Sequence, residues 1–228
     1  AALALAVTSI SMAMIPLLDY LGRVTAKRMI EDAGPNPALT ELPPQDQVDA
    51  IVIGCGRVGR LVSEMLTMHD VKHIIVESEP AVVTKCRGDG MPVYFGDAKN
   101  PVFLKCCGIM QARGVIITVN KPSVADDIVT SVRELRPDIV IVARAGDEGH
   151  ARHLYKLGVT DAVPETVEAS LQLSEATLVG LGVPTGPVIA SIHEKRDEFR
   201  EVLSGAAGRP TRGLRASQVK STNKEADA

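Results

Sequence analysis

Asp49-Ala-Ile-Val-Ile-Gly-Cys-Gly-Arg-Val-Gly-Arg60 is the stretch that decides the fold of this chain. A short apolar run leads directly into Gly54-x-Gly56-x-x-Gly59, and a helical pattern follows. In this context Gly54 permits a tight turn, Gly56 lets a phosphate approach the backbone, and Gly59 lets the helix pack against the strand. The start of the helix offers free N–H groups and the positive end of a dipole to an anion. The motif therefore predicts a nucleotide-binding turn.

Apolar strand patterns alternate with helical patterns along the rest of the chain. We predict six strands, at residues 49–54, 73–77, 92–95, 114–119, 138–143 and 160–163. We predict helices between them at residues 57–68, 80–87, 124–135 and 148–157, a short one from residue 101, and a long one from residue 165. Continuous apolar strands separated by helices indicate a parallel sheet that is covered on both faces. The predicted fold class is therefore α/β, a Rossmann-like doubly wound parallel sheet.

Polar residues follow the predicted strands at the edge where such a sheet binds its ligand. Glu77 ends the second strand, and an acid there accepts hydrogen bonds from ribose hydroxyls and repels a 2′-phosphate, which favours NAD(H) or AMP over NADP. We expect Asp97 either to receive an adenine amino group or to cap the next helix. Arg144 is expected to fork onto a phosphate or to form a structural ion pair, and Asn120 to face the ligand or to lie in a turn. The candidate nucleotide-binding residues are Gly54, Gly56, Arg57, Val58, Gly59, Glu77, Asp97, Ala98, Thr118, Asn120 and Arg144.

Composition excludes several other classes of protein. The net charge is −3 and aromatic residues make up 3% with no Trp, so we expect no nucleic-acid partner. The four cysteines form no C-x-x-C pair, which argues against a disulfide framework or a zinc site and favours a reduced environment. His150 and His153 lie three residues apart on a predicted helix, but no further ligands have metal-site spacing. We therefore predict no metal, and a helix-packing or interface role for the two histidines.

The chain also lacks the catalytic motifs of two common enzyme classes. None of its three tyrosines is followed four residues later by the lysine that a short-chain dehydrogenase needs, and no Gly-x-Ser-x-Gly elbow is present. Too few residues follow Val163 for a separate substrate domain. A nucleotide site without catalytic residues indicates a sensor.

The N-terminal segment is strongly apolar, since its first 18 residues carry no charge. A membrane-spanning helix needs about 20 such residues, so we expect the end of one truncated transmembrane helix. The alternatives are a buried soluble helix and a signal or anchor segment. Arg23, Lys27 and Arg28 follow the apolar run, which places the downstream residues in the cytoplasm by the positive-inside rule.

We accordingly expect five segments. They are the end of a transmembrane helix at 1–22, a Pro-containing linker at 23–48, the nucleotide-binding domain at 49–165, a helical extension at 166–204 and a disordered tail at 205–228.

An ordered series of motifs resembles one known family. The series is Ile53-Gly-Cys-Gly-Arg-Val-Gly59, Glu77, Phe95-Gly-Asp-Ala98, Ile141-Val-Ala-Arg-Ala145, Asp147-x-x-His150, Leu154-x-x-x-Gly158-Val159 and Pro164-Glu165. It resembles the RCK N-terminal (TrkA-N) domain, most of all the copy in Kef-type potassium/proton antiporters of the cation:proton antiporter-2 class. Residues 9–18 resemble the last membrane helix of those antiporters, and the whole resemblance covers about residues 7–182.

The resemblance implies a protein of the inner or plasma membrane that exchanges K⁺ for H⁺, with the residues after about 22 on the cytoplasmic side. It implies a regulatory domain that forms a homodimer, binds NAD(H) or AMP without catalysis, and acts on the membrane transport domain of the same polypeptide. Arg57 and Arg144 match family positions near the nucleotide and the dimer cleft. Some members respond to glutathione, but Gly146 stands where the best-known members carry a second arginine, which argues against that effector here. The alternatives are the gating domain of a potassium channel or of a Trk/Ktr-type uptake system, and a soluble NAD-dependent oxidoreductase.

Overall fold

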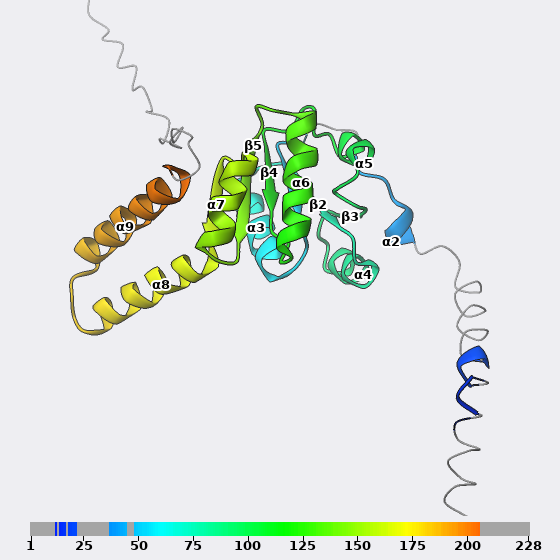
Figure 1. Cartoon of the computed structure of the whole chain (residues 1–228), viewed down its shortest axis with the longest axis horizontal. Coiled ribbons are helices and arrows are strands. Elements are labelled where there is room, and N and C mark those ends of the chain that lie inside the picture. The colour runs from blue at the N-terminus through cyan, green and yellow to red at the C-terminus, as the bar shows by residue number, and fades with distance from the viewer. Residues whose placement is uncertain (1–11, 13, 17, 22–36, 45–47, 206–228) are drawn as a thin grey trace, which may run out of the picture. The chain divides into compact units, whose positions relative to one another are not determined.

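The computed structural model describes residues 12, 14–16, 18–21, 37–44 and 48–205 (Figure 1). Most of the predicted transmembrane segment and linker, and all but the first residue of the predicted tail, lie outside these residues. The chain divides into two compact units, residues 1–41 and 42–228. In the first unit the described residues between 12 and 21 are helical, and α2 spans Pro37–Thr40. Across the described residues, no helix has the length and apolar character needed to cross a membrane.

The second unit contains one sheet of six strands in the order β3-β2-β1-β4-β5-β6 (Figure 1). All five neighbouring pairs are parallel. The order reverses direction at β1 and β4, which is the switch point of a doubly wound sheet. The predicted Rossmann-like α/β fold is therefore confirmed. The strands are β1 (Ala50–Ile53), β2 (His73–Glu77), β3 (Val93–Phe95), β4 (Gly114–Ile117), β5 (Val140–Ala145) and β6 (Asp161–Pro164).

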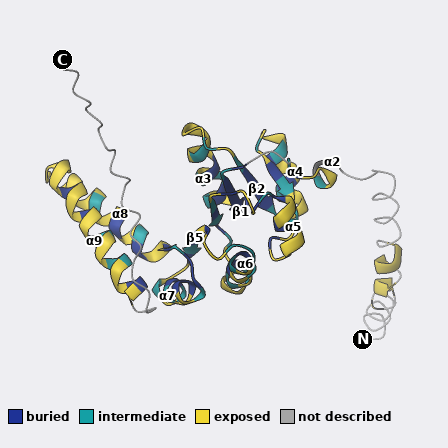
Figure 2. Cartoon of the chain, turned by 90° about the horizontal axis from the view of Figure 1, so that it is seen from above, coloured by how far each residue is buried: buried dark blue, intermediate teal, exposed yellow. Residues whose placement is uncertain are grey.

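Helices lie on both sides of this sheet (Figure 2). On one side, α3 (Arg57–Met68) packs on β1 and β2, and α4 (Pro80–Gly88) packs on β2 and β3. On the other side, α6 (Pro122–Leu135) packs on β5, and α7 (Glu148–Leu157) packs on β5 and β6. The short α5 (Pro101–Cys106) contacts α6.

Two further helices form a hairpin after the sheet. They are α8 (Glu165–Gly180) and α9 (Thr185–Gly205), which pack against each other, and α9 also packs on α7. A buried polar group fastens α9 to the domain, because Asp161 Oδ1 accepts a hydrogen bond of 2.7 Å from the Tyr155 hydroxyl while Asp161 Oδ2 lies 3.2 Å from Arg200 Nε. Burial, and then the bond to Asp161, raise the pKa of Tyr155, so this phenol stays protonated at neutral pH.

The sheet is not covered evenly. All four residues of β1 are buried, as expected for a strand with a layer on each face. In β4 and β5 burial alternates instead: Ile117 and Ile141 are buried, whereas Ile116 is half-buried and Val140 is 37% exposed. The expectation of a sheet covered on both faces therefore holds at β1 and is wrong at β4 and β5. The cause is that α3 and α4 both pack over the β1–β3 half, while α8 leaves the sheet to pack on α9.

The contact between Gly59 and Gly54 gives a direct test of this packing. A Cβ atom on Gly59 would lie 2.0 Å from the Gly54 carbonyl oxygen, so Gly59→Ala should lower the free energy of unfolding by about 2–3 kcal/mol in a urea titration. Gly56→Ala is the matched control, because its Cβ would meet no atom within 4 Å. Gly56→Ala should lower the free energy of unfolding by less than about 1 kcal/mol. Equal losses for the two variants would contradict the close approach.

Candidate functional site

The glycine-rich turn between β1 and α3 is fixed by backbone conformation and by close contacts. Gly54 has a φ of 102°, which favours glycine, and no side chain fits at Gly59. Thr118, buried at the end of β4, donates its hydroxyl to Ile53 O at 2.9 Å and lies 3.2 Å from Gly54 O. The position of Gly56 is different, since a Cβ there would meet no atom within 4 Å. The turn is therefore rigid at its base and open to a ligand at its tip.

A cleft of about 610 Å³ opens between this turn and α4, and we call it the turn–α4 cleft. Its volume lies in the range of about 300–1,000 Å³ that is usual for small-molecule sites. No side chain caps the N-terminus of α3, which leaves the N–H groups of its first turn free for an anion. The residues that line the cleft include Gly56, Arg57, Arg60, Glu77, Val82 and Lys85.

Glu77 is held in place at the end of β2 by three backbone N–H groups. Its Oε2 accepts a bond of 2.8 Å from Cys55 N, and its Oε1 accepts bonds of 2.7 Å from Ser78 N and 2.9 Å from Glu79 N. A carboxylate can accept about four hydrogen bonds, so Oε2 keeps capacity for a ribose hydroxyl. Glu77 thus braces the glycine-rich turn as well as lining the cleft, a role that the sequence did not indicate.

Asp97 lies outside the turn–α4 cleft. Its Oδ1 accepts a bond of 2.9 Å from Lys99 N, and α5 is capped by Asn100, whose Oδ1 accepts a bond of 2.9 Å from Val102 N. The capping alternative for Asp97 is therefore wrong, because the cap is three residues further along. Asp97 lines a second cleft of about 450 Å³, together with Ser131 and other residues of α6.

Arg144, at the end of β5, forms an ion pair with the first residue of α8. Its Nε lies 2.7 Å from Glu165 Oε1, and its Nη2 donates to Glu165 Oε2 at 2.8 Å. The structural ion pair that we gave as one alternative for this residue is present, and the phosphate contact stays a prediction. The fork geometry holds the base of α8 beside β5.

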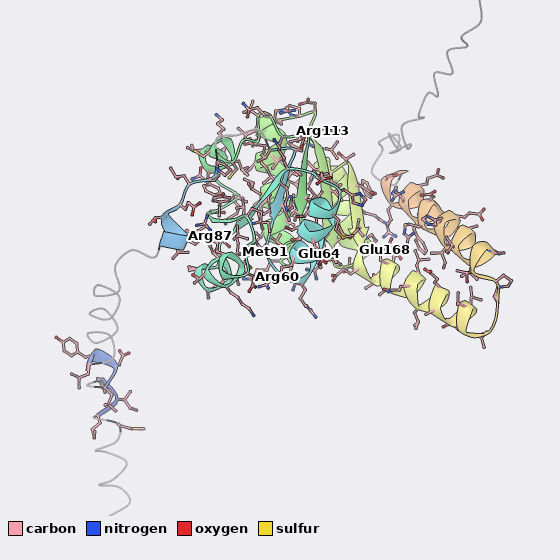
Figure 3. All side chains as sticks on the ribbon, turned by 180° about the vertical axis from the view of Figure 1, so that it is seen from behind. Arg60, Glu64, Arg87, Met91, Arg113 and Glu168 are labelled. Atoms are coloured by element: carbon pink, nitrogen blue, oxygen red, sulfur yellow. The ribbon has the colours of Figure 1, made fainter. Side chains whose placement is uncertain are left out.

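A third cleft, of about 670 Å³, lies between α3 and α8 over the uncovered half of the sheet, and we call it the apolar trough. Val58 and Leu61 of α3 form one wall, and Ile116, Val142 and Val163 of β4, β5 and β6 are also among its lining residues. In Figure 3, Glu64 of α3 and Glu168 of α8 are labelled on this side of the domain. Thr118 and Arg144 line the trough and not the turn–α4 cleft.

The structure therefore distributes most of the candidate residues over three clefts, and Ala98 and Asn120 line none of them. Gly56, Arg57 and Glu77 come together in the turn–α4 cleft, with Gly54 and Gly59 shaping its base. Ala98 is buried, and Asn120 is exposed after β4. Lys85 and Val82 of α4 also line the cleft. The sequence does not indicate these two residues, because α4 carries no motif and only its position after β2 places it at the cleft.

The two histidines join α7 to α6 through one carboxylate. His150 Nε2 lies 3.4 Å and His153 Nε2 lies 3.1 Å from the carboxylate oxygens of Asp126. This geometry agrees with the expected helix-packing role. In the described part of the chain, no group of three or more His, Cys, Asp or Glu side chains is arranged to hold a metal ion.

A glycine-rich turn at the switch point of a six-stranded parallel sheet places this domain in the Rossmann-like class, with a cleft beside the turn. The sequence profile of the TrkA-N domain matches residues 50–165, about half of the chain. The chain belongs to the TrkA-N domain family.

Two similar proteins are potassium efflux antiporters. The putative K(+) efflux antiporter KefB of Alkalimonas amylolytica is 31% identical over 157 residues, which are 69% of this chain and 24% of that protein. The chloroplastic K(+) efflux antiporter 3 of Arabidopsis thaliana is 30% identical over 228 residues, which are 95% of this chain and 29% of that protein. The chain thus spans under a third of the length of these relatives.

A solved structure with the same fold is the Shewanella denitrificans Kef CTD in its AMP-bound form. It is 26% identical, with a TM-score of 0.60, and the match covers 70% of this chain and 97% of that chain.

The bracing role of Glu77 leads to a stability prediction. In Glu77→Gln one oxygen becomes an amide NH₂ that cannot accept, so at least one of the three backbone N–H groups of Cys55, Ser78 and Glu79 loses its partner. We expect a loss of about 1–3 kcal/mol in the free energy of unfolding, measured by urea denaturation. Glu79→Gln makes the same change at an exposed neighbour, and its free energy of unfolding should stay within about 0.5 kcal/mol of the wild-type value. An unchanged midpoint for Glu77→Gln would show that the carboxylate does not brace the turn.

Proposed function

We propose that this chain is the nucleotide-sensing regulatory part of a membrane antiporter that exchanges K⁺ for H⁺. The observation that carries the proposal is the turn–α4 cleft, where an uncapped helix N-terminus, an open glycine and a strand-end carboxylate converge in a TrkA-N domain. The potassium efflux antiporters among its relatives support this reading over a potassium channel or a Trk/Ktr-type uptake system.

The ligand that suits the cleft is AMP or NAD(H). Its phosphate would lie against the first turn of α3 beside Gly56, with Arg57 and Lys85 as neighbouring cations. The ribose hydroxyls would donate to Glu77, and the same carboxylate would repel a 2′-phosphate. A Kef CTD of the same fold has been solved with AMP, which supports a mononucleotide of this kind.

In this proposal the nucleotide is a signal and not a substrate. It changes transport only if its affinity differs between two arrangements of the regulatory domain. The transport domain would be in the same polypeptide and would precede the residues of this chain, with residues 1–22 as the end of its last membrane helix. The chloroplastic antiporter supports a longer polypeptide, because 95% of this chain aligns with only 29% of that protein. Residues 23–48 would link membrane and domain, and everything after about residue 22 would be cytoplasmic.

A second copy of the chain is the proposed partner of the apolar trough. The trough exposes Leu61 and Val163 to solvent, at 60% and 36% of their surfaces. Covering such a patch is favourable by about 25 cal/mol for each Å² of apolar surface removed from water. A homodimer formed through this half of the sheet would give β4 and β5 the second layer that β1 already has.

Calorimetry with the purified chain tests the nucleotide site. The wild-type chain should bind AMP or NADH, and Gly56→Val should weaken binding at least about tenfold, because its side chain would occupy the space left for the phosphate. Gly186→Val, in α9 with equally open space around it, should leave the affinity unchanged. No binding of either nucleotide to the wild-type chain would overturn the proposal.

Sedimentation velocity tests the dimer. Leu61→Asp places a charge in the trough and should convert the dimer to a monomer, with the circular dichroism spectrum unchanged. Met68→Asp lies on the same helix at 69% exposure and is not a trough residue, so it should remain dimeric. A wild-type chain that is monomeric at high concentration would contradict this assignment.

A further inference from the structure

Two buried thiols meet beside the glycine-rich turn. Cys55 lies between Gly54 and Gly56, and Cys86 lies on α4. Their exposed fractions are 1% and 0%, and their Sγ atoms are 2.7 Å apart. Both are free thiols.

This separation is shorter than ordinary packing produces. Carbon atoms in contact lie about 3.5–4.0 Å apart, and sulfur is a larger atom. A disulfide has an S–S length of about 2.04 Å. The two Sγ atoms are therefore already placed so that a small movement of α4 or of the turn would bring them to bonding distance.

The pair joins the two walls of the turn–α4 cleft. The backbone N–H of Cys55 donates to Glu77 Oε2 at 2.8 Å, so this residue is part of the brace that positions the carboxylate. Cys86 lies on the same helix as Val82 and Lys85, which line the opposite wall. The walls are also linked by Arg60 of α3, labelled in Figure 3, whose Nη1 lies 3.3 Å from Asp89 at the end of α4. A covalent bond between the thiols would draw the walls together.

We propose that Cys55 and Cys86 form a reversible disulfide that lowers the affinity of the cleft for its nucleotide. The affinity part rests on the proposed function, whereas the disulfide itself does not. The bond narrows the cleft and moves Cys55 N–H relative to Glu77, and both changes act on the residues expected to contact the ribose and the phosphate.

The oxidant is a hydroperoxide. One thiolate attacks a peroxide oxygen and becomes a sulfenic acid, while the other oxygen leaves as water or an alcohol. The second thiol then attacks the sulfenic sulfur, the S–S bond forms and water leaves. The two thiols together lose two electrons and two protons, and the peroxide gains them. A dithiol reductant restores both thiols by exchange.

Burial controls the rate of this reaction. Burial first, and then Cys86, raise the pKa of Cys55 to about 12, so almost all of it is protonated at neutral pH. Because the thiolate is the reactive form, oxidation requires the cleft wall to open. A nucleotide that covers the turn should therefore slow the oxidation.

The first experiment uses the whole 228-residue chain and hydrogen peroxide. Thiols are counted in denaturant before and after treatment, and the disulfide is located by peptide mapping without reduction. We expect two thiols to be lost, a Cys55–Cys86 linked peptide, and full recovery with dithiothreitol. Cys106→Ser, at an exposed thiol of α5, should behave like the wild type, whereas Cys86→Ser and Cys86→Ala should each prevent the linked peptide. Oxidation confined to Cys106, or sulfinic acid without a linked peptide, would overturn the proposal.

The second experiment compares AMP and NADH affinity before and after oxidation. The oxidised wild-type chain should bind at least about tenfold more weakly, and Cys86→Ser should bind equally well in both conditions. Equal binding by the two wild-type forms would overturn the affinity part. A disulfide that forms in a chain binding neither nucleotide would instead refute the proposed function and leave the thiol pair standing.

Discussion

The approach of Gly59 to the Gly54 carbonyl is the contact on which the rest of the domain depends. It allows α3 to begin directly at the end of β1, and a methyl group at residue 59 would lie 2.0 Å from that oxygen. Thr118, at the end of β4, holds the turn from the other side by donating its hydroxyl to Ile53 O. The β1–α3 turn thus meets the end of β4, which is far from it in the chain, at one point of the sheet. The position of α3 then sets both the turn–α4 cleft and one wall of the apolar trough.

Much of the fold could be predicted because its signals are local. Prolines mark the first residues of α4, α5 and α6, Asp147 caps α7 and Gly158 ends it with a φ of 104°. The bounds of α3, β2 and α7 agree with the prediction to the residue. The apolar strands and their alternation with helices were enough to indicate the parallel sheet.

The parts that could not be predicted depend on contacts between distant residues. Arg144 forms an ion pair with Glu165, 21 residues further along, and no local pattern in the sequence indicates that partner. The apolar residues of β4 and β5 look like those of a doubly covered strand, and their sequence alone does not show that one face is only partly covered. Likewise, the meeting of Cys55 and Cys86 follows from the packing of α4 and not from their spacing.

The attachment of the α8–α9 hairpin has a mechanical consequence. The hairpin is held at its base, by Arg144 on Glu165 and by Arg200 on Asp161, and α8 extends from there for 16 residues. A helix of that length is about 24 Å long, so a tilt of about 10° at the base would carry its far end through about 4 Å. Any movement of the hairpin relative to the sheet would therefore pivot at its base, where these two charged contacts lie and where α9 packs on α7 with Leu203 in the main core. A displacement at this base that is too small to alter the hydrogen bonds of the sheet would move the far end of α8 by about the size of a side chain.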